Sequence, residues 1–417
     1  MKFKLTGGTY LNSEGEKTPF ETIVVEDGLI RSIDQPDGGE ANTINCKGKL
    51  VVPTLTDLGM VVSSLNVIDL ELKAAAAGGV GRVCLMPNTS PVNDVPAISK
   101  LIEQQVTPFT GAELIMIGAM TKSLEGKLLS EYAELKDSGC KALSNGFTTM
   151  DTLAISKRCF DYAYTYDLTI FMHPMVRSLY QGSMHSGAIS TRMGLKGIPN
   201  IAETVAIAQL IMLAEASGVR LHLSNLSCED SVNLVREAKK KGTRITADVA
   251  IANLCYTDEA VLGFNNNFHT IPPLRSERDR KALIEGVIDG TIDAITSAHE
   301  PRSVSAKNAP FAESATGIST IEHVFHYAMK LDSAGELALE VFIKAMNERS
   351  SAVLGLQANQ IMPGQKANFS ILNFDERTLD ESDIHSSGKN TPLLGEQVTG
   401  TIEHTFVSGA LVYSASS

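Results

Sequence analysis

The sequence lacks the features that mark several common classes of protein. It has no tryptophan, and its six cysteines stand singly with no C-x-x-C pair: Cys46, Cys84, Cys140, Cys159, Cys228 and Cys255. This spacing argues against a disulfide framework or a zinc knuckle and indicates reduced, mostly buried thiols. No stretch approaches the 18 uninterrupted apolar residues of a membrane span, and the N-terminus lacks the apolar segment of a signal peptide. We therefore expect a cytoplasmic protein that does not span a membrane.

Positive charge is also scarce. The chain has 36 Lys and Arg against 48 Asp and Glu, a formal net charge of −12. A nucleic-acid-binding protein needs clustered cations for the phosphates, so this balance argues against that class. The length of 417 residues allows two or three domains, or one large barrel with an appendage.

The short motifs of several catalytic classes are missing as well. There is no H-x-H or H-E-x-x-H for a metal, no G-x-S-x-G for acyl transfer and no G-x-x-x-x-G-K-[ST] loop for phosphate. No early strand is followed by G-x-G-x-x-G, which weakens the alternative of a doubly wound open sheet.

The segments that are present indicate two kinds of structure. Both ends contain short β-type stretches separated by turns, such as KFKLTGGTYL and QKANFSILNFD. We expect residues 1–50 and 360–417 to form one small composite β-sandwich domain. The middle, residues 51–359, alternates apolar runs with helix-period segments eight times. The expected strands are 50–60, 81–87, 113–120, 141–145, 169–174, 220–227, 244–250 and 293–301, and a last helix covers 337–355. This alternation predicts an α/β fold, a (β/α)8 TIM barrel.

Catalytic groups of such barrels lie at the C-terminal ends of the strands. The strand ends offer His173, His222, Asp248 and His299 as possible ligands of a metal. Side chains alternate between the faces of a strand, so His222 and Asn225 are expected to point in opposite directions. A single His at a strand end is more often a hydrogen-bonded core residue than a ligand. Likewise, a lone cysteine near a strand end, such as Cys84 or Cys228, is more often a packing residue than a catalytic thiol. The pattern indicates a catalytic type of scaffold with few catalytic groups.

Several long phrases resemble the dihydroorotases of the amidohydrolase superfamily. They are LVVPTLTDLG, AAAAGGVGRVCLMPNTSPVND, SGAISTRMGLKGIPNIAE, IPPLRSERDRKALIEGVIDGTIDAITSAHEP and KNAPFAESATGISTIE, and the similarity extends over essentially the whole chain. The resemblance implies an amidohydrolase-type barrel with a composite β-sandwich. It also implies metal-dependent closure or opening of the dihydroorotate ring in pyrimidine synthesis.

The chain departs from this family at five of the six metal-binding or proton-transfer positions. The H-x-H after the first strand corresponds to Gly59 and Val61, the acidic or carbamylated ligand of strand four to Asn145, the strand-six His to Asn225 and the strand-eight Asp to Ala298. Only the strand-five ligand is kept, as His173. Neutral amides bind zinc poorly, and one imidazole cannot hold a metal against water. We therefore expect no zinc and no other cofactor.

The positions that contact substrate in the family are also altered. Ser63 replaces the Arg that grips a carboxylate, and Ile271 replaces the Asn before P-P-L-R. Asn88 still matches a substrate contact, and Arg302 replaces the second His of the T-D-H-A-P-H phrase. We predict a vestigial pocket made by Asn88, His173, His299 and Arg302.

The leading interpretation is a catalytically inactive dihydroorotase-like protein. Some bacteria carry such degenerate chains as non-catalytic partners of aspartate carbamoyltransferase, so the resemblance implies a structural or regulatory role, as an oligomer, in pyrimidine biosynthesis. Two alternatives remain open at this point. One is an active cyclic amidohydrolase with a rebuilt metal site at His173, His222, Asp248 and His299. The other is a barrel that binds a pyrimidine intermediate through Asn88 and Arg302.

Overall fold

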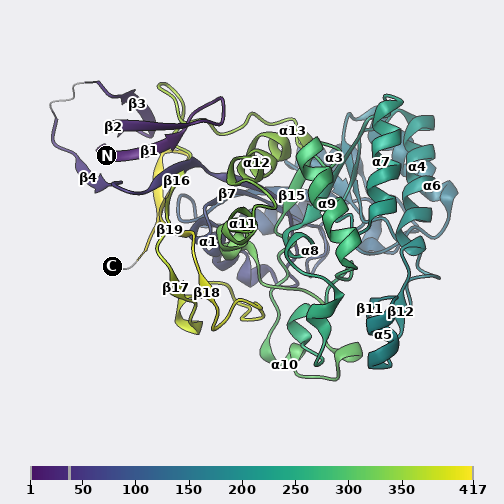
Figure 1. Cartoon of the computed structure of the whole chain (residues 1–417). Helices are drawn as coiled ribbons and strands as arrows, with labels where there is room; N and C mark the ends of the chain where they lie inside the picture. Colours follow the sequence, from purple (N-terminus) through teal and green to yellow (C-terminus); the bar gives the residue numbers. More distant parts are fainter. Residues whose placement is uncertain (1, 36–38, 416–417) are drawn as a thin grey trace.

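The computed structural model describes residues 2–35 and 39–415, and a parallel barrel forms its centre (Figure 1). Eight strands follow one another in chain order around it: β6 (Leu55–Met60), β7 (Val80–Leu85), β8 (Glu113–Ala119), β9 (Ala142–Ser144), β10 (Thr169–Met172), β13 (Leu221–Leu223), β14 (Ile245–Ala250) and β15 (Ala294–Thr296). A parallel bridge between Met60 and His299 brings the first and last strands together. The predicted (β/α)8 barrel is confirmed, and the open-sheet alternative is wrong.

A helix follows each barrel strand and covers its outer face. These helices are α1 (Ile68–Ala77), α2 (Pro96–Glu103), α3 (Tyr132–Asp137), α4 (Leu153–Thr165), α6 (Ile201–Ser217), α7 (Glu229–Lys240), α9 (Glu277–Asp289) and α11 (Val324–Ser333). Helix α7 illustrates why they form, because its acidic residues lie in the first turn and its lysines in the last, where the helix dipole favours them. Its buried face carries Val232, Val235 and Ala238. Within the described part of the chain, no helix is both long and apolar enough to cross a membrane.

Short elements are inserted where the barrel strands end. They include β11 (Met184–His185), α5 (Ala188–Met193), β12 (Gly197–Ile198), α8 (Ile251–Cys255) and α10 (Val304–Lys307). In Figure 1, α5, β11, β12 and α10 gather at the bottom of the view, beyond one end of the barrel. The predicted last helix is confirmed as α12 (Leu339–Lys344) and α13 (Ser350–Val353), joined by one turn of π-helix at Ala345–Arg349.

The two ends of the chain join in one mixed sheet. Its strands are β1 (Lys2–Leu11), β2 (Lys17–Glu26), β3 (Leu29–Ile33), β4 (Asn42–Asn45), β5 (Leu50–Pro53), β16 (Phe369–Asn373), β19 (Thr401–Val407) and β20 (Ala410–Ser414). Strand β5 pairs with β1 on one side and β16 on the other, which links the two ends. Phe3 on β1 contacts Phe406 on β19, with ring centroids 5.1 Å apart, although β16 and β5 separate those strands. The sheet therefore curls around its own apolar core.

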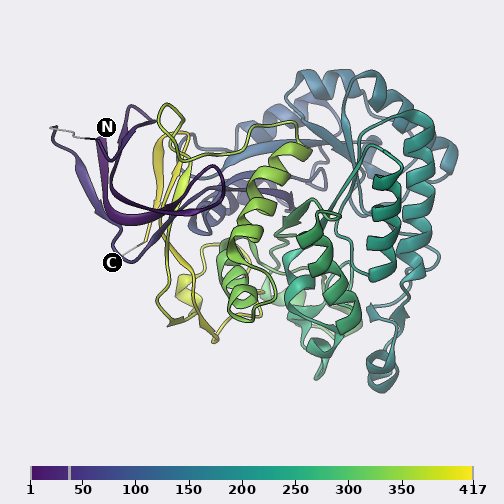
Figure 2. The same cartoon turned by 45° about the horizontal axis from the view of Figure 1, so that its top comes forward.

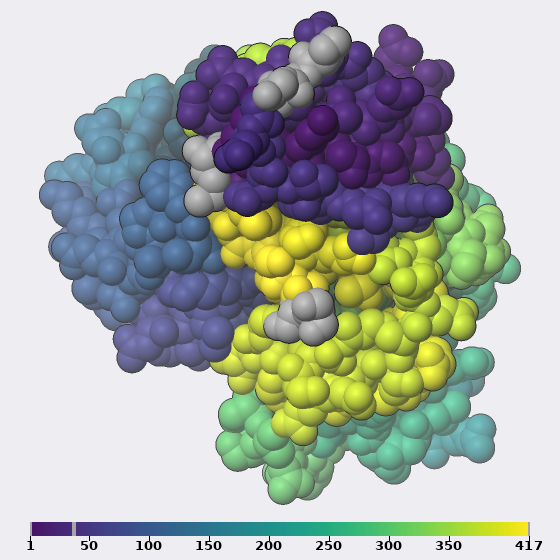
Figure 3. Space-filling view, turned by 90° about the vertical axis from the view of Figure 1, so that its left-hand side faces the viewer, coloured from purple at the N-terminus to yellow at the C-terminus, as the bar shows by residue number. Residues whose placement is uncertain are grey.

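Figures 2 and 3 show these terminal segments side by side, purple against yellow, at one side of the barrel. The expected single strand 50–60 is wrong, because it divides at Thr54 into β5 and β6. The Thr54 N–H donates to Asn368 of the terminal sheet, whereas the Leu55 N–H donates to Gly79 beside the barrel. The chain thus passes from the terminal sheet into the barrel within one apolar run.

Candidate functional site

A cavity opens at the mouth of the barrel, where the parallel strands end. Seven of the eight strands, or the loops that follow them, contribute to its wall: Leu58, Gly59 and Val61; Met86 and Asn88; Gly146 and Phe147; His173; Ser224 and Asn225; Asp248, Ala250, Ala252, Asn253, Thr270, Ile271 and Pro272; and Thr296, Ser297, Ala298, Glu300, Gly317, Ile318 and Thr320. Its volume is about 50 Å³, which leaves room for a few waters or part of a small molecule. The cavity lies where barrels of this type place their catalytic groups.

Four of the five altered positions face this cavity. Gly59, Val61, Asn225 and Ala298 all line it. Glycine, valine and alanine carry no side-chain atom that binds a metal, so three of the four add only apolar surface or empty space. Only Asn225 offers a polar atom, and its buried Oδ1 has no hydrogen-bond partner.

The fifth altered position, Asn145, is used in the structure of its own loop. Its Oδ1 accepts a hydrogen bond from Thr121 Oγ1 at 2.7 Å, and its Nδ2 donates to the carbonyl of Thr148 at 3.0 Å. The side chain is 1% exposed and lies outside the cavity wall. Asn145 therefore holds the chain after β9 in place and does not serve the cavity.

His173 projects into the cavity as the surviving imidazole. Both ring nitrogens are shielded from solvent, no side chain binds them, and the ring meets Phe147 edge to face at a centroid distance of 5.1 Å. Burial lowers the pKa of His173, and the negative charge of Glu203 offsets only part of that effect. The backbone of Ser224 also interacts with the ring and raises the pKa slightly, but burial dominates, so the ring is neutral at pH 7.

Asn88 is the second predicted pocket residue that the structure places in the cavity. Its buried Oδ1 also lacks a partner. The amide packs closely against Gly146, where a Cβ would lie 2.5 Å from both the Oδ1 and the Nδ2 of Asn88. Gly146 has a φ of 57°, so this close approach and this backbone conformation both favour glycine there.

The backbone at two altered positions adopts the left-handed region, which is rare for residues other than glycine. The φ angles are 58° at Asn225 and 48° at Ala298. Conformations of this kind cost about 1–3 kcal/mol each and concentrate at functional sites. At Asn225 the strained backbone is held by Asp248, whose Oδ1 accepts a hydrogen bond from the Asn225 N–H at 2.5 Å.

This backbone conformation also corrects the expectation that His222 and Asn225 point in opposite directions. Strand β13 ends at Leu223, so strict alternation stops before Asn225 is reached. His222 lies inside the barrel, with its Nε2 2.9 Å from Asp248 Oδ2 and its Nδ1 2.8 Å from Thr246 Oγ1. Asn225 lines the cavity together with Asp248. Both side chains thus lie on the barrel side.

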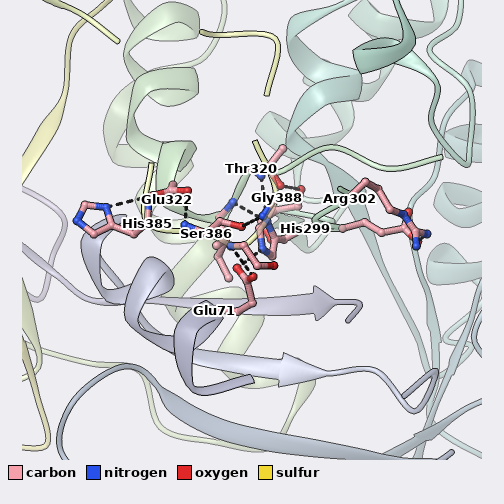
Figure 4. Close-up of polar contacts among 12 residues, drawn as sticks. Glu71, His299, Arg302, Thr320, Glu322, His385, Ser386 and Gly388 are labelled. Atoms are coloured by element: carbon pink, nitrogen blue, oxygen red, sulfur yellow. Dashed lines mark hydrogen bonds and ion pairs between the residues drawn. The ribbon is translucent and has the colours of Figure 1, made fainter. Parts of the chain in front are cut away.

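His299, predicted in the pocket, lies elsewhere (Figure 4). It is fully buried, and its Nε2 is 2.9 Å from Glu71 Oε2. Its Nδ1 accepts hydrogen bonds from the backbone N–H groups of Thr320 and Ile321. The proton is therefore on Nε2 and is donated to Glu71. The expectation is wrong because a partner on α1, 228 residues away in sequence, takes the imidazole.

Glu71 completes this buried group. Its Oε1 accepts a hydrogen bond from the Ser387 N–H at 2.9 Å. Burial raises the pKa of Glu71, but the hydrogen bonds from His299 and Ser387 outweigh that effect, and the pKa is lowered overall. The Glu71–His299 pair therefore fastens the segment around Ser387 to the barrel.

The fourth predicted pocket residue, Arg302, also lies outside the cavity wall. Its Nε donates to the carbonyl of Thr316 at 2.8 Å, and its Nη2 is paired with Glu300. Arg302 is turned away because the Glu300 carboxylate, which does line the cavity, binds the guanidinium. Of the four predicted pocket residues, the structure brings together only Asn88 and His173.

The cysteines near strand ends are buried. Cys84 lies in the apolar interior of the barrel, and burial raises its pKa well above the ordinary value. Cys228 is also buried, with its Sγ 3.0 Å from Ser231 Oγ, and burial raises its pKa as well. Thiols of this kind are inert, as expected for packing residues.

Comparisons with known proteins identify the family. A model described as dihydro-orotase-like matches residues 48–231. A dihydroorotase-like protein of Pseudomonas aeruginosa is 34% identical, over 99% of this chain and 100% of that protein. A dihydroorotase of Thermoanaerobacter is 36% identical, over 99% of this chain and 97% of that protein. The chain belongs to the dihydroorotase family. A dihydroorotase-like protein of Pseudomonas putida is 36% identical over 98% of each chain.

A solved structure supports the fold at lower sequence similarity. The L-hydantoinase (dihydropyrimidinase) of Arthrobacter aurescens superposes with a TM-score of 0.86 at 21% identity, over 100% of this chain and 96% of that one. The predicted amidohydrolase type of barrel, with strands from both termini beside it, is thereby confirmed.

The zinc implied by the family resemblance does not fit the residues in this cavity. Gly59, Val61 and Ala298 have no donor atoms, and both polar atoms of the Asn145 amide are engaged. Among the family's ligand positions, His173 is then accompanied only by the neutral amide of Asn225, while the Asp248 and Glu300 carboxylates of the wall are bound to His222, the Asn225 N–H and Arg302. Across residues 2–35 and 39–415, no group of three or more His, Cys, Asp or Glu is arranged to hold a metal ion. The family's metal thus lacks the ligands that would hold it at this cavity.

Two residues near the cavity were not singled out from the sequence. Asp57 on β6 is fully buried and accepts hydrogen bonds from Thr296 Oγ1 and from the N–H and Oγ of Ser297. Burial raises the pKa of Asp57, although these hydrogen bonds lower it in part. Glu300 lines the cavity, and burial raises its pKa too. Their positions in the sequence could have indicated them, because Asp57 lies toward the end of the first expected strand and Glu300 directly follows His299.

Proposed function

We propose that this member of the dihydroorotase family is non-catalytic and acts as a structural or regulatory partner in pyrimidine biosynthesis. One observation carries the proposal: three of the family's ligand positions present no donor atom to the cavity, and Asn145 is bonded to its own loop. A dihydroorotase needs a metal to lower the pKa of water and to polarise the ring carbonyl. Without those ligand atoms, no metal is held at the cavity to activate water or to polarise the carbonyl.

The intact scaffold supports a role that depends on the fold and not on the cavity. All eight barrel strands and their covering helices are present, and the curled terminal sheet has its own apolar core. The partner we propose is aspartate carbamoyltransferase, by analogy with the degenerate dihydroorotase-like chains of some bacteria. The net charge of −12 is compatible with a complementary surface on that enzyme.

A first experiment tests the loss of catalysis. Protein purified without added zinc is expected to hold well under one equivalent of metal and to give no dihydroorotase turnover. Its melting temperature should be the same with and without a chelator, because no metal-binding energy is coupled to folding. A stoichiometric metal that survives dialysis, together with turnover, would overturn the proposal.

A second experiment tests the partner. The chain and the aspartate carbamoyltransferase of the same organism, co-expressed, are expected to elute together, and earlier than either alone, in size-exclusion chromatography. The transferase should be less stable or less active without this chain, because a partner that binds only the folded assembly stabilises it. His173→Ala serves as the control and should leave both results unchanged. Separate elution at micromolar concentration, with a fully active transferase, would contradict the partnership.

The alternative of a rebuilt metal site has little support in the geometry. Its four proposed ligands were His173, His222, Asp248 and His299. Both nitrogens of His299 are bonded to Glu71 and to backbone N–H groups, and His222 is held between Thr246 and Asp248. Of these four side chains, only the imidazole of His173 is bound by no other side chain.

A further inference from the structure

A second cavity lies where the barrel meets the terminal sheet. Its volume is about 190 Å³, against about 50 Å³ for the cavity at the barrel mouth. Its wall comes from the start of α11, from β17 (Arg377–Thr378) with the loop that follows it, and from β19 and β20. Among the described residues, the two cavities share none of their lining. The second cavity is therefore a separate site.

Three side chains in the wall of this second cavity carry buried polar atoms that have no partner within residues 2–35 and 39–415. The atoms are Nδ1 and Nε2 of His323, Nδ1 of His326 and Oγ1 of Thr401. The two imidazole rings are stacked, with centroids 5.5 Å apart, and His323 is 2% exposed. Buried polar atoms are nearly always paired, so these side chains call for a partner from outside the chain.

The two carboxylates of the wall do not supply this partner, because the protein already uses all four of their oxygens. Glu322 accepts hydrogen bonds from two backbone N–H groups and is paired with the side chain of His385 (Figure 4). Asp383 is paired with Arg377 through one oxygen, and its other oxygen accepts a backbone N–H at 2.9 Å. A ligand in the cavity would therefore meet no unpaired negative charge.

The groups that stay available are mostly donors, and one of them is a cation. A guanidinium has five N–H groups, and within the described part of the chain only the Nη2 of Arg377 is paired, with Asp383. The hydroxyl of Thr401 can donate its proton. Burial lowers the pKa of His323 to about 4 and that of His326 to about 3, so both rings are neutral at pH 7. Each neutral ring has one donor and one acceptor nitrogen.

We propose that this second cavity binds hydrogen phosphate through Arg377, Thr401 and the two imidazoles, and that it distinguishes phosphate from sulfate. The oxygens of the anion accept from the guanidinium, the hydroxyl and an imidazole N–H. Its P–O–H group donates to the acceptor nitrogen of His323, which has no other partner. Sulfate has the same shape but no proton at neutral pH, so it leaves that nitrogen unpaired. The inference goes beyond the proposed function, since neither a metal nor a partner protein enters it.

Titration calorimetry with inorganic phosphate tests the site on the full chain, at pH 7 in a phosphate-free buffer, before and after treatment with a chelator and dialysis. We expect one saturable site with a Kd below about 1 mM in both preparations. Sulfate should bind at least about tenfold more weakly, because one buried acceptor stays unpaired.

Thr401→Val is the variant that tests the location of the site. It should weaken phosphate binding about fivefold or more. Its melting temperature without phosphate should equal that of the unaltered chain, because the hydroxyl it removes has no partner in the protein. Thr378→Val, an exposed position beside Arg377 on β17 and outside the cavity wall, is the matched control and should leave phosphate binding unchanged.

The outcomes separate this inference from the proposed function. Equal affinity for phosphate and sulfate would overturn the assignment, because only attraction to Arg377 would then remain. No phosphate binding at millimolar concentration, or normal binding by Thr401→Val, would also overturn it. Phosphate binding that is lost after chelator treatment would reveal a metal and overturn both proposals. Phosphate binding without co-elution of the transferase would overturn the partnership alone.

Discussion

Replacing Glu71 by alanine tests the interpretation that the buried His299 is a structural residue. Glu71 is 0% exposed and accepts two hydrogen bonds, one from His299 Nε2 and one from the Ser387 N–H, each at 2.9 Å. Alanine removes both acceptors and leaves two buried donors unpaired. Each unpaired donor costs about 1–3 kcal/mol, so the expected loss is about 4 kcal/mol.

Glu71→Gln is the graded variant. The amide keeps one acceptor oxygen for one of the two donors and turns its NH₂ group toward the other. One buried donor then stays unpaired, and the expected loss is about 2 kcal/mol. Glu285→Ala, on the exposed face of α9, is the matched control and should change stability by less than about 0.5 kcal/mol.

Two measurements follow the effect. The shift in melting temperature is the lost free energy of unfolding divided by the unfolding entropy. For a chain of 417 residues, each 1 kcal/mol lost lowers the melting temperature by roughly 1 °C, so Glu71→Ala should melt about 4 °C lower. Hydrogen exchange should accelerate in the segment around Ser387, which loses its anchor. A shift below about 1 °C with unchanged exchange there would refute the reasoning, as would equal effects of Ala and Gln.

Two further predictions concern the cavity and the junction with the terminal segment. The variant with Gly59→His, Val61→His and Ala298→Asp should show no dihydroorotase turnover, because catalytic groups that act as a unit gain little from partial repair; measurable turnover would show a less altered site. Burial lowers the pKa of His323 to about 4 and that of His326 to about 3. Below pH 6.5 the unfolded chain therefore takes up protons that the folded chain does not, and stability should fall by about 2 kcal/mol for each histidine between pH 7 and 5. Urea unfolding at both pH values should show a smaller loss in His326→Phe; an equal loss would contradict this assignment.

The architecture could be predicted from the sequence because it depends on a pattern repeated many times. Eight apolar runs, each followed by a helical segment, specify the barrel even when single boundaries shift. The 50–60 run shows the limit of this reasoning, since β5 and β6 are both almost completely buried and their tertiary partners differ. Pro53 is the local sign of a break, since proline is disfavoured inside a strand, but nothing local records that the hydrogen bonds pass from Asn368 to Gly79.

The site was less predictable because side-chain direction beyond a strand end depends on single dihedral angles and distant partners. Asn225 reaches the cavity through a φ of 58°, which strand alternation cannot anticipate. His299 turns to Glu71, and Asn145 turns to Thr121. Which residues could carry chemistry was readable from the sequence, but where each of them points was set by contacts remote in the chain.

The distribution of hydrogen bonds explains how the side chains at Gly59, Val61 and Ala298 can differ from those of the family while the fold is kept. Hydrogen bonds to the protein fix the turn at Ala298. Asp57 accepts hydrogen bonds from Thr296 and Ser297, and the Thr296 hydroxyl accepts one from the Ala298 N–H. The Asn225 backbone is likewise held by Asp248. Asp248, Thr296 and Ser297 also line the cavity, but their hydrogen bonds run to the protein and involve no side chain of Gly59, Val61 or Ala298. None of these buried hydrogen bonds involves a side chain at an altered position, so the left-handed backbone frame does not depend on which side chains stand there. A change at Asp57 or Asp248, by contrast, would leave buried donors unpaired and cost several kcal/mol.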